Sequence, residues 1–387
     1  MLSIRFAKPP PTERSRTIGP MTMTNRLADD LDNILARTEP LWAGLRGERI
    51  LITGATGFFG CWLLESFAWA NRRLNLNAQA VAMSRHPETL AQKAPHLASD
   101  PAIALHAADI RSGDFPVGKF SHVIHAATEA SAKLNHESPL VMLDTIVEGT
   151  RRTLQFAAAA RVTRFLFVSS GAVYGNQPSH LTQLSESFEG GPNPLDPASA
   201  YAEGKRAAEM LCALSTTSGL AIPVARCFAF VGPYMQIDAH FAIGNFISNA
   251  LADEPIQVKG NGSPMRSYLY ASDLAVWLWT ILFKGQSGRA YNVGSEDALN
   301  IAALAHEVAA ATRKNGSKKI AVSIAERPIP GASVHRYIPS TARSRQELGL
   351  HVEVPLREAI RRTHSWFSAE SSASSDQPVA AARGHHA

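Results

Sequence analysis

Short apolar runs alternate with segments of helical spacing from residue 49 to about residue 226. The runs are too short for helices and too uniformly apolar for strands with one solvated face, so they predict strands buried on both faces. We expect these strands at 49–53, 78–84, 103–106, 121–126, 164–169 and 222–226, with helices at 59–69, 142–160 and 200–216. The alternation predicts an α/β fold, a Rossmann-type doubly wound parallel sheet.

After residue 231 the alternation weakens, and prolines and a Gly-Asn-Gly segment mark loops. Helices are expected at 240–252 and 273–283, the second with Asp273 as N-cap, then a strand at 290–293 and a helix at 301–312. This pattern predicts a smaller substrate-binding region grafted on the sheet.

These patterns divide the chain into four parts. We predict a partly disordered N-terminal extension at 1–45 with one helix at 25–37, and a dinucleotide-binding domain at 46–230 with a return segment at 268–296. The substrate-binding region is expected at 231–267 and 297–367. The Ser/Ala-rich tail at 368–387 is expected to be disordered.

The net charge of +5 is concentrated near the N-terminus, where residues 1–26 hold five basic residues and one acidic residue. The remainder of the chain is therefore nearly neutral, which argues against a nucleic-acid partner. The longest apolar run, Leu274–Phe283, is about half the roughly 20 residues of a membrane span. Cys61, Cys212 and Cys227 show no metal or disulfide spacing. We expect a cytoplasmic protein with no metal and no membrane partner.

A glycine-rich segment follows the first predicted strand and opens a predicted helix. It reads Thr53-Gly54-Ala55-Thr56-Gly57-Phe58-Phe59-Gly60. Glycines allow a tight turn and close approach of backbone to a diphosphate, which the N–H groups of the helix N-terminus then bind. The spacing alone is a weak signal, and a glycine-rich turn without a ligand is the alternative; the strand before it and the helix after it favour a dinucleotide site.

Two further segments carry candidate chemistry. Tyr201 and Lys205 share one face of a predicted helix, where the lysine cation could stabilise a tyrosinate that works as acid and base. The alternative is an exposed Tyr–Lys pair. The segment Val168–Gly175 places Ser170 at a strand end, where a small hydroxyl can reach into a cleft; a plain strand-terminating turn is the alternative.

In this order the three motifs closely resemble the extended short-chain dehydrogenase/reductase family, in its nucleotide-sugar epimerase and dehydratase branch. The resemblance runs from about Arg49 to Phe367 and includes Gly232–Pro233, Gly260–Asp273 and Tyr291–Ser295. It implies an NAD(P)-dependent enzyme acting on a nucleotide sugar.

The resemblance also implies residue roles. Tyr201 would be the acid/base, Lys205 would also hold the nicotinamide ribose, and Ser170 would hydrogen-bond the substrate oxygen. The cofactor would contact the glycine segment (Gly54, Thr56, Gly57, Phe58, Phe59, Gly60), the end of the second strand (Ser84, Arg85), the adenine-flanking pair (Asp109, Ile110), and Ala126, Ala127, Tyr201 and Lys205. Arg266 and Arg336 would grip the diphosphate, a role that suits guanidinium groups.

The chain departs from the family pattern at two positions. The family often has Asn where this chain has Ile146 and Ala229, and the second Asn usually helps to bind the substrate diphosphate. The identity of the sugar and of the nucleotide therefore does not carry over.

The end of the second predicted strand bears on the choice of cofactor. It reads Met83-Ser84-Arg85 and lacks the acidic residue that usually holds the adenine ribose of NAD. A hydroxyl and an arginine suit a 2′-phosphate better, so we expect NADP to be preferred over NAD. The alternative is that Arg85 stacks on adenine or faces water.

The residues after Ser170 bear on the reaction. The 4,6-dehydratases of this family carry an Asp–Glu pair there, and the related decarboxylases a glutamate, whereas this chain has Gly171 and Ala172. Elimination across C5–C6 needs a base and an acid that these two residues do not supply. We therefore expect epimerisation through a transient keto sugar, with NADPH-dependent reduction of a keto sugar as the alternative.

Two expectations concern other classes and assembly. A cofactor-binding scaffold or sensor without turnover is a further alternative, but the retained Tyr–Lys pair argues against it. In the family the helices corresponding to 142–160 and 200–216 commonly pair across a two-fold axis, and both are rich in alanine here. We expect a homodimer.

Overall fold

The computed structural model describes residues 25–128, 132–216, 219–237, 241–313, 319–329, 331 and 333–375. Its centre is a sheet of seven parallel strands. In spatial order the strands are β11 (Ala290–Val293), β6 (Val224–Cys227), β5 (Arg164–Ser170), β4 (His122–His125), β1 (Arg49–Thr53), β2 (Gln79–Ser84) and β3 (Ile103–Ala107). This is the Rossmann-type sheet that the sequence predicts. Residues 1–24 of the N-terminal extension predicted at 1–45 lie outside the described residues.

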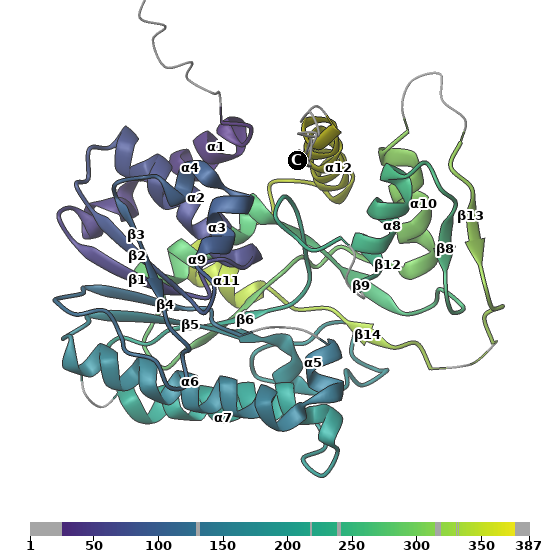
Figure 1. Cartoon of the computed structure of the whole chain (residues 1–387). Helices are drawn as coiled ribbons and strands as arrows, with labels where there is room; N and C mark the ends of the chain where they lie inside the picture. The colour runs from purple at the N-terminus through teal and green to yellow at the C-terminus, as the bar shows by residue number, and fades with distance from the viewer. Residues whose placement is uncertain are drawn as a thin grey trace, which may run out of the picture.

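Helices cover both faces of the sheet, as Figure 1 shows. They are α1 (Ala28–Thr38), α2 (Phe58–Arg73), α3 (Glu88–Lys93), α4 (Pro95–Ala98), α5 (Ala132–Glu137), α6 (Pro139–Ala159), α7 (Ala200–Ser215), α9 (Ala271–Lys284) and α11 (Ala342–Leu348). Side chains alternate across a strand, so Ile50 and Ile52 join the core under α2 and α9, while Leu51 joins the core under α6 and α7. Both faces of the sheet are therefore shielded from solvent, which explains why the strands are uniformly apolar.

The N-terminal helix α1 packs against α9 and is held there by a buried charge. Asp273, fully buried, accepts hydrogen bonds from Arg37 and from the backbone N–H groups of Glu353 and Val354. The prediction that Asp273 caps α9 is wrong, because the helix begins two residues earlier and Tyr270 is its N-cap. The carboxylate instead joins three separate segments of the chain.

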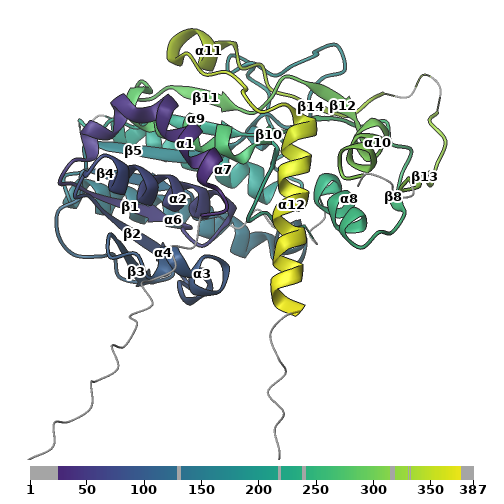
Figure 2. The ribbon, with the colours of Figure 1, turned by 90° about the horizontal axis from the view of Figure 1, so that it is seen from above.

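The smaller region lies to one side of the sheet (Figures 1 and 2). It contains α8 (Ala242–Leu251), α10 (Ile301–Ala311), α12 (Leu356–Ser375), β7 (Phe230–Val231), β8 (Ile256–Val258), β9 (Met265–Ser267), β10 (Leu269–Tyr270), β12 (Ala298–Asn300), β13 (Val322–Ile324) and β14 (Arg336–Tyr337). The strands form small sheets, one of which has the order β12-β9-β14.

The last helix continues past the boundary placed at residue 367 from the sequence. α12 runs to Ser375, so residues 368–375 of the predicted disordered tail are helical, and residues 376–387 lie outside the described part. Serine and alanine at these positions are compatible with a helix that is already nucleated by its packed first turns. Composition alone therefore misplaced this boundary.

Candidate active site

The glycine segment joins β1 to α2 in a tight turn at the carboxyl edge of the sheet. Gly54 has φ of 69°, and a Cβ there would lie 2.6 Å from the carbonyl oxygen of Ala126. A Cβ at Gly60 would lie 2.4 Å from the Ala55 backbone, so this glycine lets the helix pack against the turn. Both positions require glycine for steric reasons.

The N-terminus of α2 is open to a ligand. Gly57 is the N-cap of this 16-residue helix and provides no side-chain cap, so the first N–H groups of the helix keep their donor capacity. Together with the helix dipole, they form a site for a diphosphate. The residues present thus fit the diphosphate of NAD(P), with Thr56, Phe58 and Phe59 in the same turn.

The end of β2 borders this turn and carries hydroxyl and cationic groups. The hydroxyls of Ser84 and Thr56 lie 2.9 Å apart, and Nζ of Lys93 donates to the Thr56 carbonyl oxygen at 3.0 Å. Hydrogen bonds from Arg111, and more weakly the charge of Arg85, lower the pKa of Asp109 to about 2. The Arg85 charge is therefore near enough to act on the Asp109 carboxyl group.

The end of β4 lines the same edge. The Ala127 N–H donates to the Thr53 hydroxyl at 3.2 Å, which also contacts Nδ1 of the buried His125 at 2.8 Å. Nε2 of His125 lies 3.1 Å from the Thr150 hydroxyl. Burial, aided by the charge of Lys205, lowers the pKa of His125 to about 3. This histidine is neutral and structural, so it is not a candidate acid or base.

The predicted catalytic groups meet next to this edge. Tyr201 and Lys205 lie one turn apart on α7, and Ser170 at the end of β5 is near enough to the Tyr201 hydroxyl to act on its pKa. The Lys205 ammonium, almost fully buried, donates to the Val168 carbonyl oxygen at 2.7 Å and to the Thr128 hydroxyl at 3.0 Å. It lies 6.0 Å from the centre of the Tyr201 ring.

Burial shapes the ionisation of both α7 groups. It raises the pKa of Tyr201 to about 12, an effect that the hydrogen bond with Ser170 partly offsets. It lowers the pKa of Lys205 to about 8, so the ammonium is still largely protonated at neutral pH. A cation beside a phenol favours loss of the phenolic proton, so a pair of this kind can act as acid and base.

Comparison with known proteins identifies this arrangement. The NAD dependent epimerase/dehydratase family model matches residues 50–294. The chain belongs to this family. The resemblance, the fold class and the enzymatic nature predicted from the sequence are confirmed.

Several characterised proteins are similar to this family member. UDP-glucuronic acid decarboxylase 1 of Arabidopsis thaliana is 26% identical over 330 residues, which cover 85% of this chain and 72% of the relative. UDP-glucuronic acid decarboxylase 1 of Xenopus tropicalis is 30% identical over 249 residues, covering 64% and 57%.

Solved structures share the fold. A UDP-glucose 4-epimerase of Thermotoga maritima with UDP-glucose superposes with a TM-score of 0.68 at 20% identity, covering 84% of this chain and 99% of that one. A dTDP-glucose 4,6-dehydratase of Streptomyces venezuelae with NAD bound gives 0.68 at 24% identity, covering 84% and 98%.

The epimerase/dehydratase site contains two aromatic residues that the sequence analysis missed. The ring of Tyr337 on β14 lies 4.6 Å from the ring of Phe228. A Cβ at Gly171 would lie 2.7 Å from both the Phe228 ring and the Tyr337 hydroxyl. These aromatic side chains lie against Gly171, so a side chain at this position would have to displace one of the two rings.

The two predicted diphosphate arginines are placed differently. In the parallel pairing of β14 with β9, Arg266 lies beside Tyr337, whereas Arg336 lies beside Met265. Neighbouring residues of a strand point to opposite faces, so Arg266 shares the face of Tyr337 and Arg336 does not. Arg266 also donates to Nδ1 of His335 at 3.3 Å. Arg266 therefore lies on the same face of this small sheet as Tyr337, with its guanidinium 6.0 Å from the centre of the Tyr337 ring.

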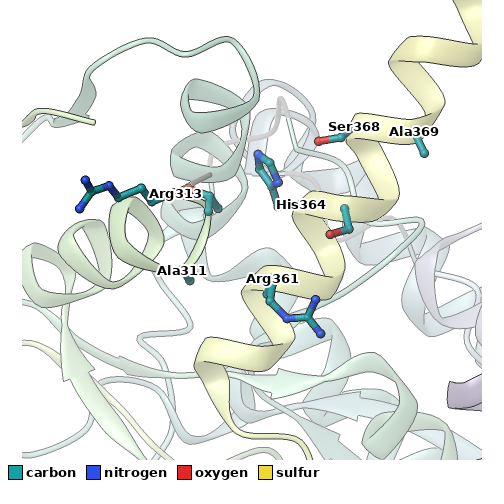
Figure 3. A pocket seen from close by; sticks show the side chains of 8 residues that line it. Ala311, Arg313, Arg361, His364, Ser368 and Ala369 are labelled. Atoms are coloured by element: carbon teal, nitrogen blue, oxygen red, sulfur yellow. The ribbon is translucent and has the colours of Figure 1, made fainter. Parts of the chain in front are cut away.

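Other parts of the described chain offer little chemistry. A pocket between α10 and α12 shares no residue with the site; it is lined by Ala311, Thr312, Arg313, Arg361, His364, Ser365, Ser368 and Ala369. Figure 3 shows the Arg313 guanidinium directed away from α12, so the two arginines of this pocket do not point toward a common ligand.

The described residues contain no cluster of three or more His, Cys, Asp or Glu suited to a metal ion. Among the helices in the described ranges, none has both the length and the apolar character to cross a membrane.

Proposed function

We propose that this protein epimerises a nucleotide-linked sugar through a transient keto sugar, using NAD(P). The observation that carries the proposal is the set of residues around Tyr201. Tyr201 can exchange one proton with a sugar hydroxyl while the cofactor takes the hydride. Gly171 and Ala172 stand where a dehydratase would have its second acid and base, and neither can transfer a proton. The UDP- and dTDP-sugar names of the similar proteins support the substrate class.

The chain's own residues supply alignment and proton control. When bound, the nicotinamide would accept a hydride from the sugar and return it. Tyr201 would take the proton of the reacting hydroxyl and give it back, Ser170 would hold the same oxygen, and the Lys205 ammonium would stabilise the phenolate. Arg266 would bind the diphosphate of the substrate, which anchors the sugar over Tyr201.

The test is product formation from UDP-, dTDP-, GDP- and CDP-hexoses, followed by NMR. An epimer formed without added cofactor supports the proposal, because an epimerase regenerates its cofactor in each turnover. Mass spectrometry of ligands that co-purify with the protein would name both cofactor and nucleotide. A protein that forms no product from any nucleotide sugar would instead match the scaffold or sensor alternative.

Reduction of a keto sugar by NADPH is the second candidate, and the end of β2 favours it. The Ser84 hydroxyl lies beside the Thr56 hydroxyl of the glycine turn, Lys93 of α3 donates to the Thr56 carbonyl oxygen, and Arg85 follows Ser84 in the chain. An NAD-preferring enzyme usually has a carboxylate at the end of this strand. Consumption of NADPH with a nucleotide-linked keto sugar would support this reaction. The solved structures with NAD or NADH show only that those neighbours bind the non-phosphorylated cofactor.

We expect wild-type protein to bind NADP more tightly than NAD. Arg85→Ala should weaken NADP binding by roughly tenfold and leave NAD binding nearly unchanged, because a charged hydrogen bond to the 2′-phosphate is lost. Dissociation constants of both cofactors, measured calorimetrically, check this. Arg73→Ala, which removes an exposed arginine paired with Asp32, is the matched control. Tighter binding of NAD to the wild type would overturn the preference.

We also propose a homodimer formed through α6 and α7. These helices lie side by side on one face of the sheet (Figure 1). Their outer surface exposes large apolar side chains, among them Leu140 (67% exposed), Met210 (60%) and Leu214 (66%). A second copy of the same surface would cover them. Light scattering at micromolar protein should give twice the chain mass, and a monomer mass would count against this assembly.

A further inference from the structure

The first turn of α7, which carries Tyr201, is capped by a different segment of the chain. Ser199 is the N-cap of α7, and its side chain makes no capping hydrogen bond. Tyr201 is the second residue of the helix, so its backbone N–H is one of the first few that find no acceptor within the helix. The side chain of Asn135, on α5, supplies this acceptor, because the Tyr201 N–H donates to Oδ1 of Asn135 at 2.9 Å.

The other half of the Asn135 amide binds the segment just before α7. Its Nδ2 donates to the Ala198 carbonyl oxygen at 2.8 Å. Ala198 belongs to a short 3-10 helix, Pro197–Ser199, and its N–H donates at 3.0 Å to the side chain of Asp196, the N-cap of that short helix. One planar amide, with an acceptor and a donor, therefore joins α5 to both sides of the junction at which α7 begins.

The later turns of α7 are anchored in another way. Glu209, two turns after Tyr201, accepts a hydrogen bond from the Ser169 hydroxyl of β5 at 2.6 Å. The same carboxylate accepts from the Arg226 guanidinium of β6 at 2.6 Å. These contacts tie the later turns to the central sheet, whereas the backbone N–H of Tyr201 is bound by Asn135 of α5.

Asn135 lies in the same connection, between β4 and α6, as Thr128. The Thr128 hydroxyl accepts from the Lys205 ammonium at 3.0 Å, and Asn135 accepts from the Tyr201 N–H. The connection begins at the end of β4, where a cofactor contact is expected at Ala127. It therefore contacts both members of the Tyr–Lys pair, one through its side chain and the other through its backbone.

We propose that Asn135 is a positioning residue for the acid–base centre: by binding the Tyr201 N–H and the Ala198 carbonyl oxygen, it holds the first turn of α7 so that the phenol stays aligned with Lys205 and the substrate. This inference rests on the proposed role of Tyr201 as acid/base. Rates depend steeply on alignment, and a misplacement of about 1 Å can cost roughly 100-fold. Asn135 acts through the Tyr201 backbone and carries no proton itself, because an amide does not titrate near neutral pH.

The test compares Asn135→Ala with Asn135→Asp, which keeps an oxygen that can accept from the Tyr201 N–H. On a nucleotide sugar that the wild type converts, the Ala variant should lose roughly ten- to 100-fold in kcat, with KM and the cofactor Kd changed by less than about twofold. The Asp variant should stay within roughly threefold of the wild type. Calorimetric cofactor stoichiometry counts the intact sites, so a smaller active fraction cannot mimic the loss.

Hydrogen exchange of the Tyr201 amide is a second readout, and it needs no turnover. This amide should exchange roughly tenfold faster or more in Asn135→Ala, because its acceptor is lost, and should stay protected in Asn135→Asp. Asn71→Ala is the matched control, since the Asn71 amide likewise binds both backbone groups of one residue, the N–H of Ala78 at 3.0 Å and its carbonyl oxygen at 3.1 Å. It should change neither kcat nor the exchange of the Tyr201 amide.

Wild-type kcat in Asn135→Ala, an equal loss of kcat in Asn135→Asp, or an unchanged exchange rate of the Tyr201 amide would each overturn the inference. In a Tyr201→Phe background, Asn135→Ala should cause no further loss of turnover, and an added loss would show that Asn135 does not act through Tyr201. Failure of the proposed function would look different. Tyr201→Phe would then retain turnover, or no nucleotide sugar would be converted, while the amide exchange would still report whether Asn135 holds the helix.

Discussion

Tyr201→Phe should lower turnover by roughly 10²- to 10⁴-fold, the range expected when a general acid–base group is lost. The substitution keeps the ring on α7 and removes only the phenolic proton carrier. Neither neighbour can replace it. Lys205 is already committed to the Val168 carbonyl oxygen and the Thr128 hydroxyl, and a serine hydroxyl such as Ser170 is too weak an acid and base.

Cofactor binding should survive this substitution, because the glycine turn and Lys205 are unchanged. Steady-state kinetics and a cofactor titration on the same preparation therefore separate loss of chemistry from loss of the site. Tyr291→Phe is a suitable control, since the Tyr291 hydroxyl donates to Glu347 on a different part of the fold. Near wild-type turnover in Tyr201→Phe would remove Tyr201 from the mechanism.

Neither dehydration nor decarboxylation should be detectable with any nucleotide sugar. UDP-glucuronate should release no carbon dioxide, and UDP- or dTDP-glucose should give no 4-keto-6-deoxy sugar, as followed by NMR and by gas analysis. Gly171 and Ala172 cannot transfer protons, and Phe228 and Tyr337 fill the space where a carboxylate at position 171 would lie. The similarity to decarboxylases at 26–30% identity makes this outcome informative.

A nearby carboxylate does not supply the missing group. Glu186 accepts a hydrogen bond from the Asn292 backbone N–H at 2.8 Å and lies 3.9 Å from Arg343. These contacts of Glu186 hold its loop against β11. Release of carbon dioxide from UDP-glucuronate, absent in Tyr201→Phe, would show that another proton donor reaches the sugar.

The parts predicted best from the sequence are those that depend on local pattern. Uniformly apolar runs mark the central strands, because both faces of the sheet are covered. The Tyr201–Lys205 pair is visible because one helical turn separates its members. The glycine turn could be predicted because the two sterically required glycines, Gly54 and Gly60, both lie within ten residues of β1.

The parts that escaped prediction depend on contacts between distant segments. Tyr337 lies beside Gly171 only because β14 pairs with β9, about 70 residues earlier in the chain. Phe228 lies beside Gly171 because β6 pairs with β5. Asp273 has the residue type and position of a helix cap, but the packing of α1 makes it a buried partner of Arg37 instead. Contacts of this kind, between segments far apart in the chain, leave no pattern in the local sequence.

The most direct measurement of the central claim uses nucleotide hexoses deuterated at every ring carbon, incubated with the enzyme in ordinary water. In the proposed reaction the ring deuterium moves to the cofactor as a deuteride and returns to the sugar. Tyr201 transfers only a hydroxyl proton, so no ring deuterium exchanges with solvent. The account predicts an epimer, formed without added cofactor, that retains all of its ring deuterium. Elimination across C5–C6 would instead release the C5 deuteron to water. An epimer or other product that has lost a ring deuteron to solvent would contradict the account.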